Sequence, residues 1–87
     1  MLLYTTENLK NIYLNPYVDM IFQEEGTICR NKLNNMTIAV KVNESVFKKI
    51  MKGITHEELI DCLVQAGIEK EESVSLVKIL FQKGVIE

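Results

Sequence analysis

Residues 37–59, TIAVKVNESVFKKIMKGITHEEL, decide the fold of this chain. The stretch begins with alternating β-branched residues, a pattern typical of a strand with one buried face. Asn43 then favours a helix start, because its side chain can accept hydrogen bonds from the free amides of the first turn. Gly53 ends that helix, and Thr55 with Glu58 has the spacing of a capping box. The stretch therefore predicts a strand followed at once by a helix–turn–helix.

Two further strands are expected before this stretch. Residues 17–23 alternate, with Val18, Met20 and Phe22 on one face, and residues 27–32 form a second run. Turns are expected at EEG, where Gly26 can adopt positive φ, and at LNN. With residues 36–42 they predict a three-stranded antiparallel meander. In the third strand, Ile38, Val40 and Val42 face one way, and Thr37, Ala39 and Lys41 face the other.

Helical periodicity continues to the end of the chain. The second helix ends at Gly67, and the third runs from near Glu69 to Lys83. The gap between these two helices is expected to be two or three residues long. The expected core stripes are Val46, Phe47, Ile50 and Met51; Leu59, Ile60, Leu63 and Val64; and Val74, Val77, Leu80 and Phe81. The predicted fold class is α+β, with a three-stranded antiparallel sheet followed by three helices in a winged helix-turn-helix-like arrangement.

The two ends of the chain are expected to pack against this core. Residues 1–16 form an N-terminal arm with a turn at Pro16, held by Leu14 and one or more of Tyr4, Ile12 and Tyr13. Residues 17–87 form a single domain, and Val85 and Ile86 tuck against the core.

Composition favours a small globular protein. The 87 residues are 47% apolar and 25% charged, with a formal net charge of −2. The start, MLLYTTENLK, lacks the basic region of a signal peptide, and no apolar run approaches the ~20 residues of a membrane span. Cys29 and Cys62 have no metal-ligand spacing and are expected to be buried, reduced thiols. We expect a soluble cytoplasmic protein that does not contact a membrane.

No residue pattern indicates catalysis. His56 is the only histidine and stands at a helix start, where a solvated side chain is expected. The acidic pairs at 24–25 and 71–72 lie in a turn and a first helical turn, and adjacent helix residues do not face each other. The four glycines are isolated, so no phosphate loop is present. The sequence predicts no enzymatic activity, no metal and no cofactor.

The helix–turn–helix raises the possibility of DNA binding. A recognition helix requires basic and amide side chains near its start. The third helix begins instead with EKEES, whose carboxylates would face the DNA backbone. Nucleic acid is therefore not an expected partner.

Two features instead indicate peptide binding. The strand at 36–42 is a sheet edge that carries one lysine, so its outer backbone groups are open to another strand. Leu76 and Ile79 are large and apolar, yet they lie outside the core stripe of the third helix, next to Lys83. They can pack under the N-terminal arm, or they can line a groove that receives an extended peptide as a fourth strand. The candidate binding residues are Thr37, Ile38, Ala39, Val40, Lys41, Leu76, Ile79 and Lys83.

The chain resembles the PqqD-like proteins, the recognition elements of pathways that make ribosomally synthesised and post-translationally modified peptides (RiPPs). The resemblance covers residues 15–87 and is carried by NPYVDMIFQEEG (15–26), VKVNESVFKKIMKGITHEELIDCL (40–63) and VKILFQKGVIE (77–87). The family usually has Leu where this chain has Val42.

This resemblance implies a free-standing recognition element of peptide natural product or bacteriocin biosynthesis. Such a protein binds the leader segment of a precursor peptide by strand addition, here along residues 36–42 and the third helix. It presents the peptide to a modifying enzyme or protease of the same pathway. A winged-helix DNA-binding regulator and a subunit that only scaffolds an enzyme complex are the alternatives.

Overall fold

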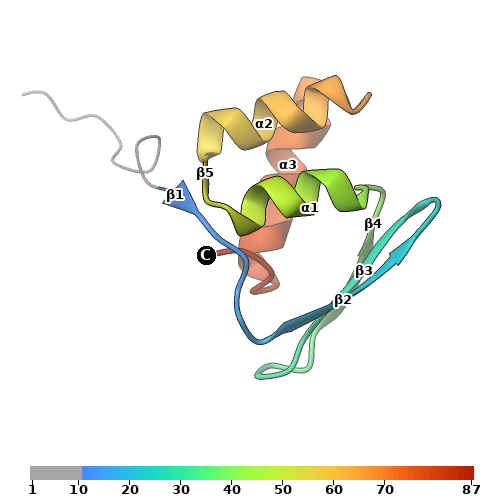
Figure 1. Ribbon diagram of the computed structural model, residues 1–87, viewed down its shortest axis with the longest axis vertical. Helices are drawn as coiled ribbons and strands as arrows, with labels where there is room; N and C mark the ends of the chain where they lie inside the picture. Colours follow the sequence, from blue (N-terminus) through green and yellow to red (C-terminus); the bar gives the residue numbers. More distant parts are fainter. Residues whose placement is uncertain (1–10) are drawn as a thin grey trace, which may run out of the picture.

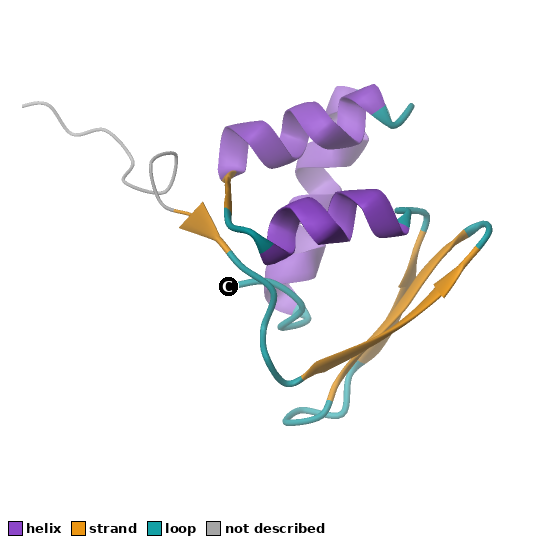
Figure 2. Ribbon diagram, in the orientation of Figure 1, coloured by secondary structure: helices purple, strands orange, loops and turns teal. Residues whose placement is uncertain are grey.

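A computed structural model describes residues 11–87, which form a three-stranded sheet, a two-stranded sheet and three helices (Figures 1 and 2). The elements in chain order are β1 (Asn11–Ile12), β2 (Val18–Gln23), β3 (Gly26–Asn31), β4 (Thr37–Val40), α1 (Glu44–Met51), β5 (Ile54–Thr55), α2 (His56–Gln65) and α3 (Lys70–Gln82). The predicted α+β class is confirmed.

The larger sheet is an antiparallel meander in the order β2-β3-β4, as predicted. A turn at residues 24–25 joins β2 to β3, with Gln23 opposite Gly26. Glycine is required at position 26 because an added Cβ would overlap the Val40 carbonyl oxygen. The chain leaves the sheet after Val40, and the buried Thr27 hydroxyl donates to the Val42 carbonyl at 2.7 Å. These contacts hold the end of β4 against β3.

Both predicted helix caps are present. The Asn43 side chain accepts a hydrogen bond from the Val46 amide at 3.3 Å, so α1 begins where expected. At the start of α2, the Thr55 hydroxyl accepts from the Glu58 amide, and the Glu58 carboxylate accepts from the Thr55 amide. These reciprocal bonds satisfy amides that lack partners within the helix.

The core lies between the three helices and the inner face of the sheet (Figure 1). Cys29, Val40 and Val42 contribute from the sheet side. The largest fully buried side chains from the helices and the C-terminal segment are Phe47, Ile50, Leu59, Leu63, Leu80, Ile86, Val77 and Val85. The predicted packing of residues 85–86 against the core is thus confirmed.

Residues 11–14 form pairings that the sequence did not predict. β1 pairs antiparallel with β5, with Ile12 opposite Ile54. The Tyr13 and Glu87 backbones exchange two hydrogen bonds of 2.9 Å each. The prediction that all strands precede the helices is therefore wrong, since β5 lies between α1 and α2. The arm was predicted to pack through Leu14 and one or more of Tyr4, Ile12 and Tyr13. Leu14 and Ile12 do pack on the core, Tyr13 is exposed, and Tyr4 lies outside the described residues.

Three residues assigned to the core are exposed. Met51, Val64 and Phe81 are 55%, 42% and 40% exposed, because the buried face of each helix is narrower than the predicted stripe. In α3 the buried residues are Ser73, Val77 and Leu80, and the Ser73 hydroxyl donates to the Glu69 carbonyl at 2.9 Å. The gap between α2 and α3, residues 66–69, is also longer than predicted.

The sheet is tied to the C-terminal end of α3. The Asn31 side-chain amide donates to the Gly84 carbonyl at 2.8 Å, just beyond the end of the helix. Asn31 also accepts hydrogen bonds from the Leu33 and Asn34 amides, which shape the turn before β4. The start of β4 is therefore placed toward the end of α3.

Candidate functional site

β4 is an edge of the three-stranded sheet, as the sequence predicted. The Asn31 amide donates to the Met36 carbonyl at 2.9 Å, so residues 31 and 36 form a hydrogen-bonded pair that leads into β4. Hydrogen-bonded and non-hydrogen-bonded pairs alternate along antiparallel strands. The register of β3 and β4 therefore determines which backbone groups of β4 are free.

Every second residue of β4 directs its backbone away from the sheet. Ile38 and Val40 belong to hydrogen-bonded pairs, so their amides and carbonyls bond to β3. Thr37 and Ala39 belong to non-hydrogen-bonded pairs, so their amides and carbonyls point to the open side. No backbone hydrogen bond outside the sheet engages these groups within residues 11–87. Ala39 thus presents one donor and one acceptor to an incoming strand.

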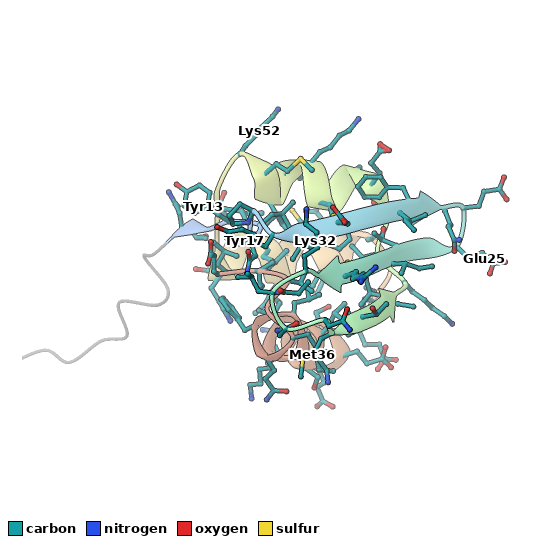
Figure 3. All side chains as sticks on the ribbon, turned by 90° about the horizontal axis from the view of Figure 1, so that it is seen from below. Tyr13, Tyr17, Glu25, Lys32, Met36 and Lys52 are labelled. Atoms are coloured by element: carbon teal, nitrogen blue, oxygen red, sulfur yellow. The ribbon has the colours of Figure 1, made fainter. Side chains whose placement is uncertain are left out.

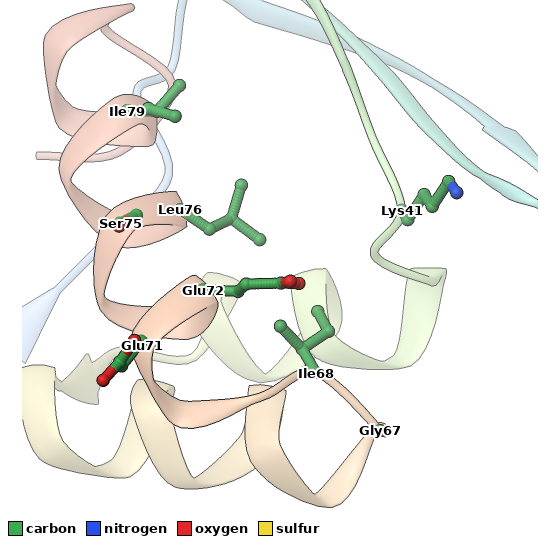
Figure 4. A pocket seen from close by; sticks show the side chains of 8 residues that line it. All are labelled: Lys41, Gly67, Ile68, Glu71, Glu72, Ser75, Leu76 and Ile79. Atoms are coloured by element: carbon green, nitrogen blue, oxygen red, sulfur yellow. The ribbon is translucent and has the colours of Figure 1, made fainter.

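A groove lies between the end of β4 and α3 (Figure 4). We call it the β4–α3 groove, and its volume is about 620 Å³. Its lining residues are Lys41, Gly67, Ile68, Glu71, Glu72, Ser75, Leu76 and Ile79. Lys41, directly after β4, meets residues of the α2–α3 turn and of α3 there.

The apolar surface of the groove comes mainly from α3 and the preceding turn. Leu76 and Ile79 point from α3 toward the side of β4, and Ile68 lies below them (Figure 4). Leu76 is half-buried and packs against the core, whereas Ile79 is 37% exposed. The apolar surface of Ile79 is thus open to a ligand, while Leu76 contacts both the core and the groove.

The charged residues of the groove are exposed and unpaired. Across residues 11–87 the ion pairs are Asp19 with Lys32 and Glu44 with Lys48, and neither involves a groove residue. Glu72 points across the groove, Glu71 points away from it, and the Lys41 side chain turns outward (Figure 4).

The structure brings together some of the predicted site residues. Lys41, Leu76 and Ile79 line the β4–α3 groove, and residues 37–40 form the adjoining edge strand. Val40 is 7% exposed and faces the core, so its own side chain does not contact a peptide at this edge. Lys83 lies at the C-cap of α3, outside the lining residues.

Sequence reasoning did not include several lining residues. Glu72 and Ser75 share a helix face with Leu76 and Ile79, so helical periodicity was sufficient to find them. Gly67 and Ile68 come from the turn before α3, whose path has no periodic signal.

A second pocket of about 450 Å³ lies on the other flank of α3. Its lining residues are Asn11, Ile12, His56, Val77, Lys78, Phe81, Gln82 and Glu87. The exposed Phe81 ring contributes to it, which accounts for the position of that residue outside the core.

The surface charges of the sheet lie away from the groove. Figure 3 shows the sheet side of the molecule, with Lys32 in the turn after β3 and Glu25 at the far hairpin. Lys32 pairs with Asp19 at 3.5 Å, and both side chains are more than half exposed. Such exposed pairs contribute little to stability.

The described residues contain no assembled metal site. Within residues 11–87 no three or more His, Cys, Asp or Glu side chains come close enough to hold a metal ion. Cys29 and Cys62 are both free, and burial raises the pKa of the Cys29 thiol to about 11. Cys29 is therefore a packed core residue that remains protonated at neutral pH. Cys62 is only half-buried, so the expectation of two buried thiols holds for Cys29 alone.

No helix within residues 11–87 has the length and apolar character needed to cross a membrane. Comparisons with protein-family models, with curated proteins and with solved structures give no match to this chain.

Proposed function

We propose that this protein is a RiPP recognition element of winged helix-turn-helix-like form, which binds the leader segment of a precursor peptide. The leader adds to β4 as a fourth strand and is presented to a modifying enzyme or protease of the same cytoplasmic pathway. The observation that carries the proposal is the free edge of β4, whose outward backbone groups adjoin the β4–α3 groove.

Backbone geometry supports strand addition. The outward amide and carbonyl of Ala39 are the groups that an antiparallel or parallel neighbour engages. Natural proteins blunt edge strands with prolines, bulges or several charges, whereas residues 37–40 contain none of these. An open edge of this kind is suited to accept a peptide strand.

The groove supports side-chain selection. Leu76, Ile79 and Ile68 offer apolar contact beside the free edge, at a size that accommodates a few side chains. Backbone hydrogen bonds along the edge then provide affinity, and this apolar surface selects among sequences.

Charge argues against the DNA-binding alternative. Glu69 occupies the N-cap position of α3, and Glu71 and Glu72 lie in its first turn, where a recognition helix requires cations. The formal net charge of −2 gives no compensating basic excess.

The proposal is tested by titrating wild-type protein and two Ala39 variants with the leader of a short precursor peptide encoded beside it. Ala39→Pro removes the outward N–H, whereas Ala39→Val keeps it and retains strand preference. We expect at least tenfold weaker binding for Ala39→Pro, because it loses a backbone hydrogen bond worth ~1–2 kcal/mol. Ala39→Val is expected to bind with near wild-type affinity. Equal affinity of both folded variants would contradict strand addition at β4.

A further inference from the structure

The β4–α3 groove combines apolar and acidic surface in a fixed order along α3. Leu76 and Ile79 are apolar, and Glu72 lies one helical turn before Leu76. Figure 4 shows these three side chains on the same side of the helix, toward β4. A ligand that runs along the groove meets a carboxylate first and apolar surface next.

Glu72 is available to a ligand cation. It forms no ion pair within residues 11–87, and its side chain points across the groove. Lys41, the basic residue among those that line the groove, turns its side chain outward. Glu57, an exposed carboxylate in the first turn of α2, does not line the groove and serves as a comparison.

The spacing of these residues matches that of a strand. Glu72 and Leu76 are four residues apart on a helix, which is a rise of about 6 Å. Side chains on the same face of a strand are two residues apart, or about 6.6 Å. A strand lying along α3 can therefore place one side chain against Glu72 and the next side chain of the same face against Leu76.

We infer that the peptide bound in the β4–α3 groove carries a lysine or arginine two positions from a large apolar residue, with the cation facing Glu72 and the apolar side chain facing Leu76 and Ile79. This inference rests on the proposed function and specifies its ligand. The ligand residue that faces Glu72 is basic because of charge complementarity. An acidic residue at that position would be repelled by the Glu72 carboxylate.

A random peptide library displayed on phage tests the inference without a known leader. Selection on the wild-type protein is expected to enrich a basic residue two positions from an apolar residue, and selection on Glu72→Lys is expected to replace the basic residue with an acidic one. The inference would be overturned, with the proposed function intact, if the selected peptides were apolar and lacked the basic residue but still lost binding to Ala39→Pro. Failure to enrich any peptide that depends on Ala39 would overturn both.

A titration then measures the interaction between the peptide cation and Glu72 directly. One selected peptide and its Lys→Gln version are titrated against wild type, Glu72→Gln and the matched control Glu57→Gln. We expect the Lys→Gln change to weaken binding to wild type by about two- to fivefold, as for a partly exposed ion pair, and to have no effect on binding to Glu72→Gln. An equal loss of affinity in wild type and Glu72→Gln, or a loss that is abolished only by Glu57→Gln, contradicts the pairing.

Discussion

Three large apolar residues of α3, Leu76, Ile79 and Leu80, test the separation of groove and core. Leu80 is 1% exposed, Ile79 is 37% exposed, and Leu76 is half-buried against the core. Each is changed to alanine in turn, and the free energy of unfolding is measured with urea. The same variants are titrated with the leader peptide by calorimetry.

The expected losses follow from burial. Leu80→Ala removes three fully buried carbons and leaves a cavity, which costs about 2–5 kcal/mol. Ile79→Ala removes the same number of carbons, worth ~0.8 kcal/mol each when fully buried. Because Ile79 is about two-thirds buried and opens to solvent, its truncation is expected to cost about 1.5 kcal/mol at most. Leu76→Ala is expected to lie between the two.

Binding is expected to follow the opposite order. Ile79→Ala and Leu76→Ala each remove groove surface and are expected to weaken leader binding by ~1 kcal/mol or more, about fivefold. Folded Leu80→Ala protein is expected to bind with near wild-type affinity. If Ile79→Ala loses as much stability as Leu80→Ala while leader binding is unchanged, Ile79 belongs to the core. The ligand site would then be sought at the pocket that contains Lys78 and Phe81.

Other regions of the molecule give further expectations. Val40→Pro removes a ladder hydrogen bond and a buried side chain, so it is expected to cost ~3 kcal/mol or more, whereas Ala39→Pro is expected to cost below ~1 kcal/mol; similar melting temperatures of the two would refute the assigned register. Duplex DNA is expected to bind no tighter than about 10⁻⁴ M at physiological salt, and a sequence-specific footprint at submicromolar protein would refute leader binding as the function. The raised pKa of Cys29, about 11 against 9.0, means that the unfolded chain loses the thiol proton first. Its contribution to stability is therefore complete below pH 9 and lost as the pH rises through about 11, so unfolding free energy is expected to fall more steeply across this range in wild type than in Cys29→Ala; parallel pH profiles would show that the thiol is not buried.

Local sequence signals predicted the elements whose determinants are local. The cap at Asn43 and the capping box of Thr55 and Glu58 satisfy amides within a few residues, so their patterns can be read directly. Alternation likewise identified β2, β3 and β4. These signals also located the free edge and two apolar groove residues, Leu76 and Ile79.

Features that depend on distant contacts were not predicted. The β1–β5 pair is two residues long on each side, so it has no periodic pattern. The rotation of α3, which buries Ser73 and exposes Phe81, is set by how α2 and the C-terminal segment pack on it. Ile68 enters the groove because of the path of the α2–α3 turn. Tertiary packing decides these positions more than local propensity does.

Amide hydrogen exchange at Ala39, measured by NMR with and without the leader peptide, tests strand addition to β4 most directly. The Ala39 amide points to the open side of the sheet, whereas the Val40 amide bonds to β3. We predict that the leader slows exchange at Ala39 strongly, while Val40 is protected in both states. Unchanged exchange at Ala39 in a saturated complex would contradict the account and place the bound peptide elsewhere on the protein.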